Sequence, residues 1–352
     1  MTNVIALNVP TRILPLEARI TALVGCFAQS RRIGADVFWL KENAELLNIL
    51  ESTGQPVAPE ALQHHVAFYE QAEKRLRFFP QYYRFLLSLV LDLEDLGMPG
   101  DTAQRMVEFA QQEGLAEAEL SDLQRAEARR LMIRRGVVSS DDPGLDDRLR
   151  RFAGRTGTFS LPNKKAAYEL THISFYLSEY GRRDPMLSVE GKLSLHFAGL
   201  TAFLDQNADL LAEICIGLRY AGVVPPSIWT DWLKGETMGF EIEEGDHVPL
   251  NDDYHEFLVC NWHQSVAGAP MFRNPIKAGR MRFERHARPT ALREISQLML
   301  SLDDARSTDW QIMRNKMAPN LSPEARDVLD IAAESSPEFD AFFEGFARAG
   351  QA

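Results

Sequence analysis

Cysteine is scarce in this chain of 352 residues, with Cys26, Cys215 and Cys260 as its three members. An odd, sparse set argues against a disulfide framework and favours a reducing compartment. Cys260 and His263 are three residues apart, so with Cys215 they offer three zinc ligands, but no fourth ligand is visible. The alternative is that these cysteines are small buried hydrophobic residues.

Long hydrophobic runs are also missing. The most apolar segment, residues 82–96, is interrupted by Arg84 and Asp92, and it is shorter than the ~20 residues that span a membrane. The first ten residues lack the basic start, apolar stretch and cleavage site of a signal peptide. We therefore expect a cytoplasmic protein with no membrane contact.

Positive charge is in deficit. Lys and Arg total 38 against 50 Asp and Glu, which gives an acidic protein with a formal net charge of −12. Such a chain repels phosphate backbones, so we expect no nucleic-acid partner. The chain also lacks a glycine-rich phosphate loop, a dinucleotide fingerprint, a Gly-x-Ser-x-Gly elbow and a His-Glu-x-x-His motif. The chain therefore contains no motif that identifies a reaction.

Alternation of period two is almost absent, which argues against a large sheet, whereas most of the chain has the helical period. The expected fold class is all-α, built of helical hairpins. Loops are predicted at 154–162, at the acidic segment 235–251, which has room for a short hairpin, and at 269–289. Helices are predicted over 17–30, 36–51, 60–77, 81–96, 101–112, 121–136, 145–153, 163–180, 190–204, 208–221, 226–233, 253–266, 290–302, 323–334 and 337–348.

Two short segments resemble each other: Asn43-Ala-Glu-Leu-Leu47 and Asn207-Ala-Asp-Leu-Leu211. Repeated helical hairpins are typical of a solenoid or of a partly closed α/α toroid. The period is not constant, so an irregular all-α globule is the alternative. The linker Ser139–Gly144 divides an N-terminal region, 1–140, from a C-terminal region, 145–352, which contains the candidate site. One continuous domain is the alternative to two.

The segment 164–181 is the most informative one. On a helix, Glu169, His172 and Tyr176 share one face beside apolar residues. Buried imidazole and carboxylate groups are costly unless they bond to each other, to water or to a metal. Two interpretations are open: a satisfied core pair, or a catalytic site in which His172 is the base or a metal ligand and Glu169 orients its ring.

Acidic residues one turn apart suggest a metal site. Asp209 and Glu213 follow this spacing on one predicted helix. The metal-binding interpretation groups them with His172 and His255 around a divalent cation, iron or zinc. Asp205 precedes Asp209 at the same spacing, and the structural alternative pairs Arg219 with one of these three acids.

Helical bundles use the spacing Glu-x-x-His to bind two irons. This spacing occurs at Glu169/His172, and the same spacing with aspartate in place of glutamate occurs at Asp252/His255. Chance predicts about one such match in a chain with 8 His and 50 acidic residues, and with Glu244/His247 in the acidic loop three are present, which is a slight excess. This spacing alone is weak support for a two-metal centre.

A run of arginines follows in an otherwise acidic protein. Arg273, Arg280 and Arg282 are the candidate substrate-binding residues of this run. Guanidinium groups recognise carboxylates and phosphates, so the loop could close over an anionic ligand. A solvated loop is the alternative.

The stretch Tyr168-Glu-Leu-Thr-His172, with 209–213 and 254–259, resembles a family of uncharacterised bacterial all-helical proteins and is distantly similar to actinobacterial helical proteins that share Glu-Leu-Thr-His. The resemblance implies site candidates (Glu169, His172, Asp209, Glu213 and His255) and no reaction. The fold of terpenoid and lanthionine cyclases is a further comparison, but this chain lacks their aspartate-rich and Cys-His motifs.

These observations lead to two functional hypotheses. The first is an enzyme that acts on a small organic substrate, neutral or anionic, through a buried site of histidines and carboxylates, with the arginine loop as a lid. The second is a non-catalytic helical adaptor that binds a protein partner on a concave surface. Convergence of His172, Asp209, Glu213 and His255 around one cavity would favour the first, and side chains that point to separate places would argue against it.

Overall fold

A computed structural model describes residues 14–32, 36–137 and 142–349 of the chain. The N-terminal ten residues and the first half of the predicted linker Ser139–Gly144 lie outside these ranges. A two-stranded ribbon consists of β1 (Glu241–Glu244) and β2 (Met281–Glu284). The α-helices are α1 (Leu16–Gly25), α2 (Val37–Ser52), α3 (Pro59–Leu62), α4 (Val66–Phe78), α5 (Tyr83–Asp95), α6 (Thr102–Gln112), α7 (Asp122–Ile133), α8 (Leu145–Ala153), α9 (Thr156–Phe159), α10 (Lys164–Leu177), α11 (Val189–Leu204), α12 (Ala208–Tyr220), α13 (Ser227–Met238), α14 (Tyr254–Val266), α15 (Leu292–Ser301), α16 (Trp310–Met317), α17 (Pro323–Ser335) and α18 (Phe339–Ala347).

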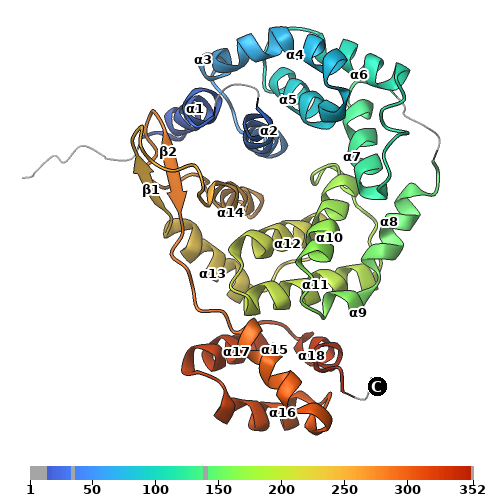
Figure 1. Ribbon diagram of the computed structural model, residues 1–352, viewed down its shortest axis with the longest axis vertical. Coiled ribbons are helices and arrows are strands. Elements are labelled where there is room, and N and C mark those ends of the chain that lie inside the picture. Colours follow the sequence, from blue (N-terminus) through green and yellow to red (C-terminus); the bar gives the residue numbers. More distant parts are fainter. Residues whose placement is uncertain (1–13, 33–35, 138–141, 350–352) are drawn as a thin grey trace, which may run out of the picture.

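The fold is all-α, as the helical period predicts. Figure 1 shows helices α1 to α14 following one another around a broad circle, with α15 to α18 grouped at one end of the molecule. Helices α2, α5, α12 and α14 lie nearer the centre of the circle than α1, α4, α6 and α13. The more specific expectation of a closed toroid or a solenoid stays a prediction.

The loop predictions were partly wrong. Residues 281–284 form a strand paired antiparallel with 241–244, with Glu241 opposite Glu284 and Glu244 opposite Met281. Met281 and Phe283 are buried while Arg282 and Glu284 face outward, so the alternation that marks a strand is present but only four residues long. The short helix α9 also lies in a segment predicted to be a loop, and helix α16 lies in a segment for which no element was predicted.

A buried arginine joins the start of the chain to its later half. Arg31 follows α1 and the π-helical turn Cys26–Ser30, and its side chain has no exposed surface. Its guanidinium donates to both oxygens of Asp252 at 2.8 Å, to Glu42 at 2.9 Å and to the Met281 carbonyl at 2.7 Å. It also lies over the rings of Phe27, Tyr254 and Phe283. This contact holds α1 and α2 against α14 and the ribbon.

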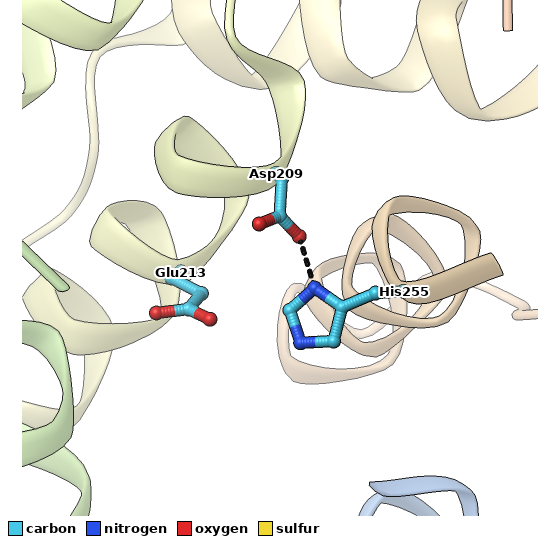
Figure 2. A group of neighbouring side chains, drawn as sticks. All are labelled: Asp209, Glu213 and His255. Carbon is cyan, nitrogen blue, oxygen red and sulfur yellow. Dashed lines mark hydrogen bonds and ion pairs between the residues drawn. The ribbon is translucent and has the colours of Figure 1, made fainter. Parts of the chain in front are cut away.

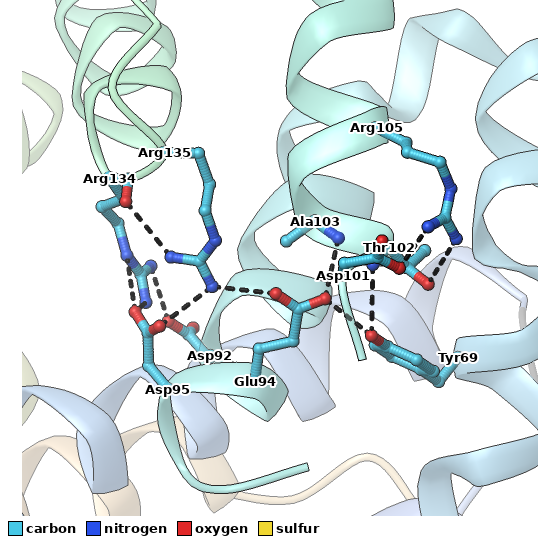
Figure 3. Close-up of polar contacts among 10 residues, drawn as sticks. All are labelled: Tyr69, Asp92, Glu94, Asp95, Asp101, Thr102, Ala103, Arg105, Arg134 and Arg135. Atoms are coloured by element: carbon cyan, nitrogen blue, oxygen red, sulfur yellow. Dashed lines mark hydrogen bonds and ion pairs between the residues drawn. The ribbon is translucent and has the colours of Figure 1, made fainter. Parts of the chain in front are cut away.

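A second polar network connects helices α5 and α7 (Figure 3). Arg134 donates to the fully buried Asp92 at 2.7 Å and to Asp95 at 2.6 Å. Arg135 pairs with Asp95 at 2.9 Å and with Glu94 at 3.0 Å. Because each carboxylate has a cationic partner, these charges are tolerated among packed helices.

The two similar segments occupy different positions in their helices. Asn207 is the residue that caps α12, and its side chain accepts from the Leu210 amide at 3.0 Å. Asn43 lies inside α2, fully buried, and donates to the Phe27 carbonyl at 3.0 Å. Their acidic third residues, Glu45 and Asp209, nevertheless contact the same histidine, as described below.

Candidate functional site

Three predicted site residues converge where α12 passes α14 (Figure 2). Asp209 lies in the first turn of α12, and Glu213 lies one turn further along the same face. His255 enters from the first turn of α14. One oxygen from each carboxylate and one imidazole nitrogen lie within 4.8 Å of one another, a spacing that suits a shared metal ion.

Both oxygens of Asp209 have partners. Oδ1 lies 2.8 Å from Nδ1 of His255, and Oδ2 accepts a hydrogen bond from the Tyr168 hydroxyl at 2.7 Å. Burial alone would raise the pKa of Asp209, but the charge and hydrogen bond of His255 lower it below its ordinary value. Asp209 is therefore an ionised group with a fixed orientation.

Glu213 is more deeply buried. Its Oε2 accepts from the Thr171 hydroxyl at 2.6 Å, whereas Oε1 has no hydrogen bond within the described residues. Burial raises the pKa of Glu213, and the nearby His172 opposes that rise. The free Oε1 is the oxygen available to a cation.

His255 is surrounded by negative charge. Burial would lower the pKa of His255, but Asp209, Glu45 and Glu213 together raise it to about 10. The ring is therefore held as an imidazolium when no other cation is bound.

Glu45 is a site residue that the sequence analysis missed. Its Oε1 lies 3.7 Å from Nε2 of His255, on the side of the ring opposite Asp209, and its Oε2 accepts from the Tyr254 hydroxyl at 2.9 Å. A signal was available: Glu45 and Asp209 are the matching acidic residues of the two similar segments. Helices α2 and α12 thus each present a carboxylate to one histidine.

His172 approaches the site from α10. Its Nδ1 lies 2.7 Å from the Tyr168 carbonyl oxygen, and its ring contacts that of Tyr176, with 5.8 Å between centroids. The expectation that Glu169 orients this ring was wrong, because Glu169 has no hydrogen bond or ion pair within the described residues and the helix backbone takes that role. Burial raises the pKa of Tyr176 well above its ordinary value.

The side chains of Asp209, Glu213, His172 and His255 are each held in place by a neighbouring residue. Each has one atom held by an outer partner: Tyr168 holds Asp209, Thr171 holds Glu213, and the Tyr168 carbonyl holds His172. For His255, Nε2 faces Glu45 while Nδ1 faces Asp209. Outer hydrogen bonds of this kind orient the ligands of metal centres.

The arginine run pairs with acidic groups of the ribbon region. Arg280 donates to the Asp246 carbonyl at 3.2 Å, and Arg282 pairs with Glu284 at 2.8 Å. Arg273 is exposed and borders a separate cavity of about 140 Å³. Arg280 and Arg282 therefore contact residues of the ribbon region, within or next to the segment that was expected to act as a lid.

Other expected ligand groups are engaged elsewhere. Both oxygens of Asp252 are bound by Arg31, so Asp252 and His255 do not form a pair of iron ligands. Arg219 forms no ion pair with Asp209 or Glu213 within the described residues; their partners are His255 and Tyr168 for Asp209 and Thr171 for Glu213.

The three cysteines are buried free thiols. Burial raises the pKa of Cys26 to about 11 and that of Cys260 well above its ordinary value, so both stay protonated at neutral pH. Burial also lowers the pKa of His263 to about 4. The metal-competent group found among the described residues does not include these side chains.

Comparisons with known proteins place the chain in a family without a known function. Among the described residues no helix combines the length and apolarity needed to cross a bilayer. No curated protein and no solved structure matches the chain. The expected membership of an uncharacterised family is confirmed. The model of one such family matches residues 1–349, and the chain belongs to that family, which is described as "Domain of unknown function (DUF6902)".

Proposed function

We propose that this chain is a cytoplasmic metal-dependent enzyme in which Asp209, Glu213 and His255 bind one divalent cation, iron or zinc. The observation that supports this most strongly is the meeting of the three side chains within 4.8 Å. Asp209 Oδ1 and His255 Nδ1 are 2.8 Å apart, close to the roughly 3 Å between adjacent ligands at right angles on a metal with bonds of about 2.1 Å. The cation would replace the proton that these two atoms share.

The raised pKa of His255 favours a metal ligand over a general base. At a pKa of about 10 the ring is almost wholly protonated at neutral pH, so it accepts no proton from a substrate. A divalent cation displaces that proton and gains two nearby carboxylates, those of Asp209 and Glu213, while Glu45 stays at the opposite nitrogen of the ring. Imidazole and carboxylate together suit iron or zinc.

His172 is the proposed general base. The Tyr168 carbonyl holds its Nδ1, so Nε2 is the nitrogen left to receive a proton. His172 also lies near enough to Glu213 to influence the pKa of that carboxyl. A base beside a metal-bound water or substrate is the usual arrangement for metal-assisted chemistry.

The substrate is a small organic molecule, and Lys41 supplies the positive charge for an anionic group. Lys41 is half-exposed, lies 3.7 Å from Glu45 and helps to lower the pKa of Asp209. It takes the role that the sequence suggested for the arginine run. The side chains of Asp209 and His255 are 17% and 33% exposed, so solvent reaches this group. The proposal requires one open position at the cation on that exposed side, as in catalytic sites.

Cobalt substitution tests whether the site binds a metal and whether that metal has an open position. We expect one Co²⁺ per chain in the metal-free protein, with a visible spectrum that changes when azide enters the open position. Asp209→Asn, Glu213→Gln and His255→Ala should abolish the spectrum while circular dichroism stays native. The matched controls Asp231→Asn and His247→Ala alter exposed residues outside the site and should leave it intact. A protein that binds no cobalt contradicts the proposal, and a spectrum insensitive to azide indicates a structural metal.

The adaptor is the second candidate function, and one observation favours it. Phe78 and Phe79 are 75% and 42% exposed at the end of α4, beside the exposed Lys74 and Arg77. Exposed aromatic residues of this kind are enriched at protein interfaces. Under the adaptor hypothesis, Phe78→Ser would abolish partner binding, whereas Asp209→Asn would lower stability alone.

A further inference from the structure

A cavity of about 260 Å³ lies apart from the candidate metal centre. It is enclosed by α9, α10, α11, α12 and the start of α15, where the C-terminal helices meet the rest of the molecule, and the Ala291 amide donates to the Leu204 carbonyl there at 3.0 Å. Its volume falls just below the range of about 300–1,000 Å³ for small-molecule sites. The cavity therefore suits a ligand much smaller than a nucleotide.

Small residues create the cavity and larger apolar residues close it. Ala167 on α10 and Ala198 and Ala202 on α11 leave the space, and Phe159 and Leu292 form part of its walls. The lining is largely apolar. An apolar space of this size has no water-binding groups across most of its wall, so an apolar ligand fills it more favourably than water does.

The polar end of the cavity holds one ion pair. Lys164 Nζ lies 2.7 Å from Asp205 Oδ2, and both residues line the cavity. The Lys164 side chain is 62% exposed, whereas that of Asp205 is 20% exposed. The lysine can swing into solvent, and the aspartate remains at the cavity wall.

The placement of this pair is opposite to what the helices favour. Lys164 is the first residue of α10, and Asp205 follows the last residue of α11. Helix dipoles favour an anion at an N-terminus and a cation at a C-terminus. A ligand that brought a carboxylate to the start of α10 and an ammonium to the end of α11 would satisfy both helices as well as both side chains.

We propose that this cavity binds a free α-amino acid with an apolar side chain. Its ammonium group pairs with Asp205, its carboxylate pairs with Lys164, and its side chain fills the space beside the three alanines. The ligand replaces the Lys164–Asp205 ion pair with two complementary ones, so no charge is left unpaired. A fatty acid or an alkylamine would match one charge and leave the other without its partner.

The site does not depend on the proposed metal chemistry. The cavity and the metal centre share helices α10 and α12 but no lining residue, because Ala167 and Leu210 face the cavity while Tyr168 and Asp209 face His255. Neighbouring residues on a helix point in different directions. Metal binding and amino-acid binding are therefore separable by mutation.

Calorimetry with L-leucine as the probe tests the proposal in the full-length chain. We expect saturable binding that raises the melting temperature, and binding of 4-methylpentanoate and 3-methylbutylamine at least about tenfold weaker, since each lacks one charged group. Asp205→Asn should weaken leucine binding at least about tenfold. Lys165→Gln, which alters an exposed neighbour outside the lining, should leave it unchanged.

Ala202→Leu fills the cavity and should abolish leucine binding. Because this change also risks overpacking, Lys164→Gln provides a second variant whose fold is not at risk. The proposal is overturned if leucine does not bind the wild-type chain, if the acid or the amine binds as tightly as leucine, or if Asp205→Asn and Lys164→Gln bind it normally.

Discussion

The pKa of a histidine in this protein depends on the groups around its ring. His255 lies between two carboxylates and keeps its proton, whereas the fully buried His65 faces the Asn43 amide oxygen at 2.8 Å. Burial lowers the pKa of His65 to about 4. Sequence could not distinguish the two, since both lie in helical segments and their partners are distant in the chain.

The lowered pKa of His65 predicts acid sensitivity. In the unfolded chain this group takes up a proton near pH 6.5, and in the folded chain near pH 4. Its contribution to stability is therefore full above about pH 6.5 and is lost as the pH falls toward 4, at up to roughly 1.4 kcal/mol per pH unit.

Urea unfolding of wild type and His65→Gln between pH 7 and pH 4.5 measures this contribution. Glutamine can still donate to Asn43 but does not titrate, so the variant should lose less stability on acidification. Equal pH dependence in the two proteins would contradict the assignment.

Glu45 is predicted to orient His255 in the metal-bound protein. Glu45→Gln keeps the size of the side chain but removes its charge beside Nε2. We expect zinc affinity to fall by about 10- to 100-fold, as is usual when an outer partner of a ligand is lost. The control is Glu51→Gln on the same helix, where Glu51 pairs with Arg182. Unchanged affinity in Glu45→Gln would show that Glu45 has no part in the site.

At the scale of helices and strands, periodicity was a sound guide where one face of a helix packs on the core. The predicted helix 208–221 corresponds to α12, and this is why Asp209 and Glu213 could be placed on one face. The ribbon escaped prediction because its alternation spans four residues among Arg, Gly and Pro. The contact of Asp252 with Arg31 escaped it because contacts between distant segments leave no local pattern, and the one sequence signal for Glu45 was its match with Asp209 in the two similar segments.

The network of α5 and α7 predicts a large effect from one arginine. Arg134→Met leaves the fully buried Asp92 without its cation, and breaking a buried ion pair costs about 3–5 kcal/mol. The exposed pair Arg77–Glu73 provides the comparison, where Arg77→Met should cost less than about 1 kcal/mol. Denaturant unfolding measures both. Similar losses in the two variants would indicate that the Arg134 network contributes no more than a surface pair.

For the whole molecule, the contacts of Arg31 and the hydrophobic core bear on the domain prediction. The larger hydrophobic cluster combines Phe27 and Leu46 from the N-terminal region with Phe257 and Phe283 from the C-terminal region. Phe27 stacks on Phe283 with 6.0 Å between ring centroids. The sequence located a linker but contained no sign that residues on its two sides share a core.

We therefore expect that residues 145–352 do not fold alone. Without the N-terminal region, Phe283 is exposed and Asp252 loses Arg31. The isolated fragment should lack a near-ultraviolet circular dichroism spectrum and bind the dye ANS, while the full chain unfolds in a single calorimetric transition. A fragment with a native-like spectrum and a sharp melting transition would establish two independent domains.

The most direct test of the metal centre is a calorimetric titration of the metal-free chain with Zn²⁺, run in parallel on Glu213→Gln. Glu213 is chosen because its free oxygen faces the cation position and its loss leaves the Asp209–His255 pair in place. We expect one zinc per wild-type chain and a clear loss of affinity in the variant, with both proteins folded. Wild-type protein that binds no zinc or iron, or a variant that binds as tightly, would contradict a metal centre at this position.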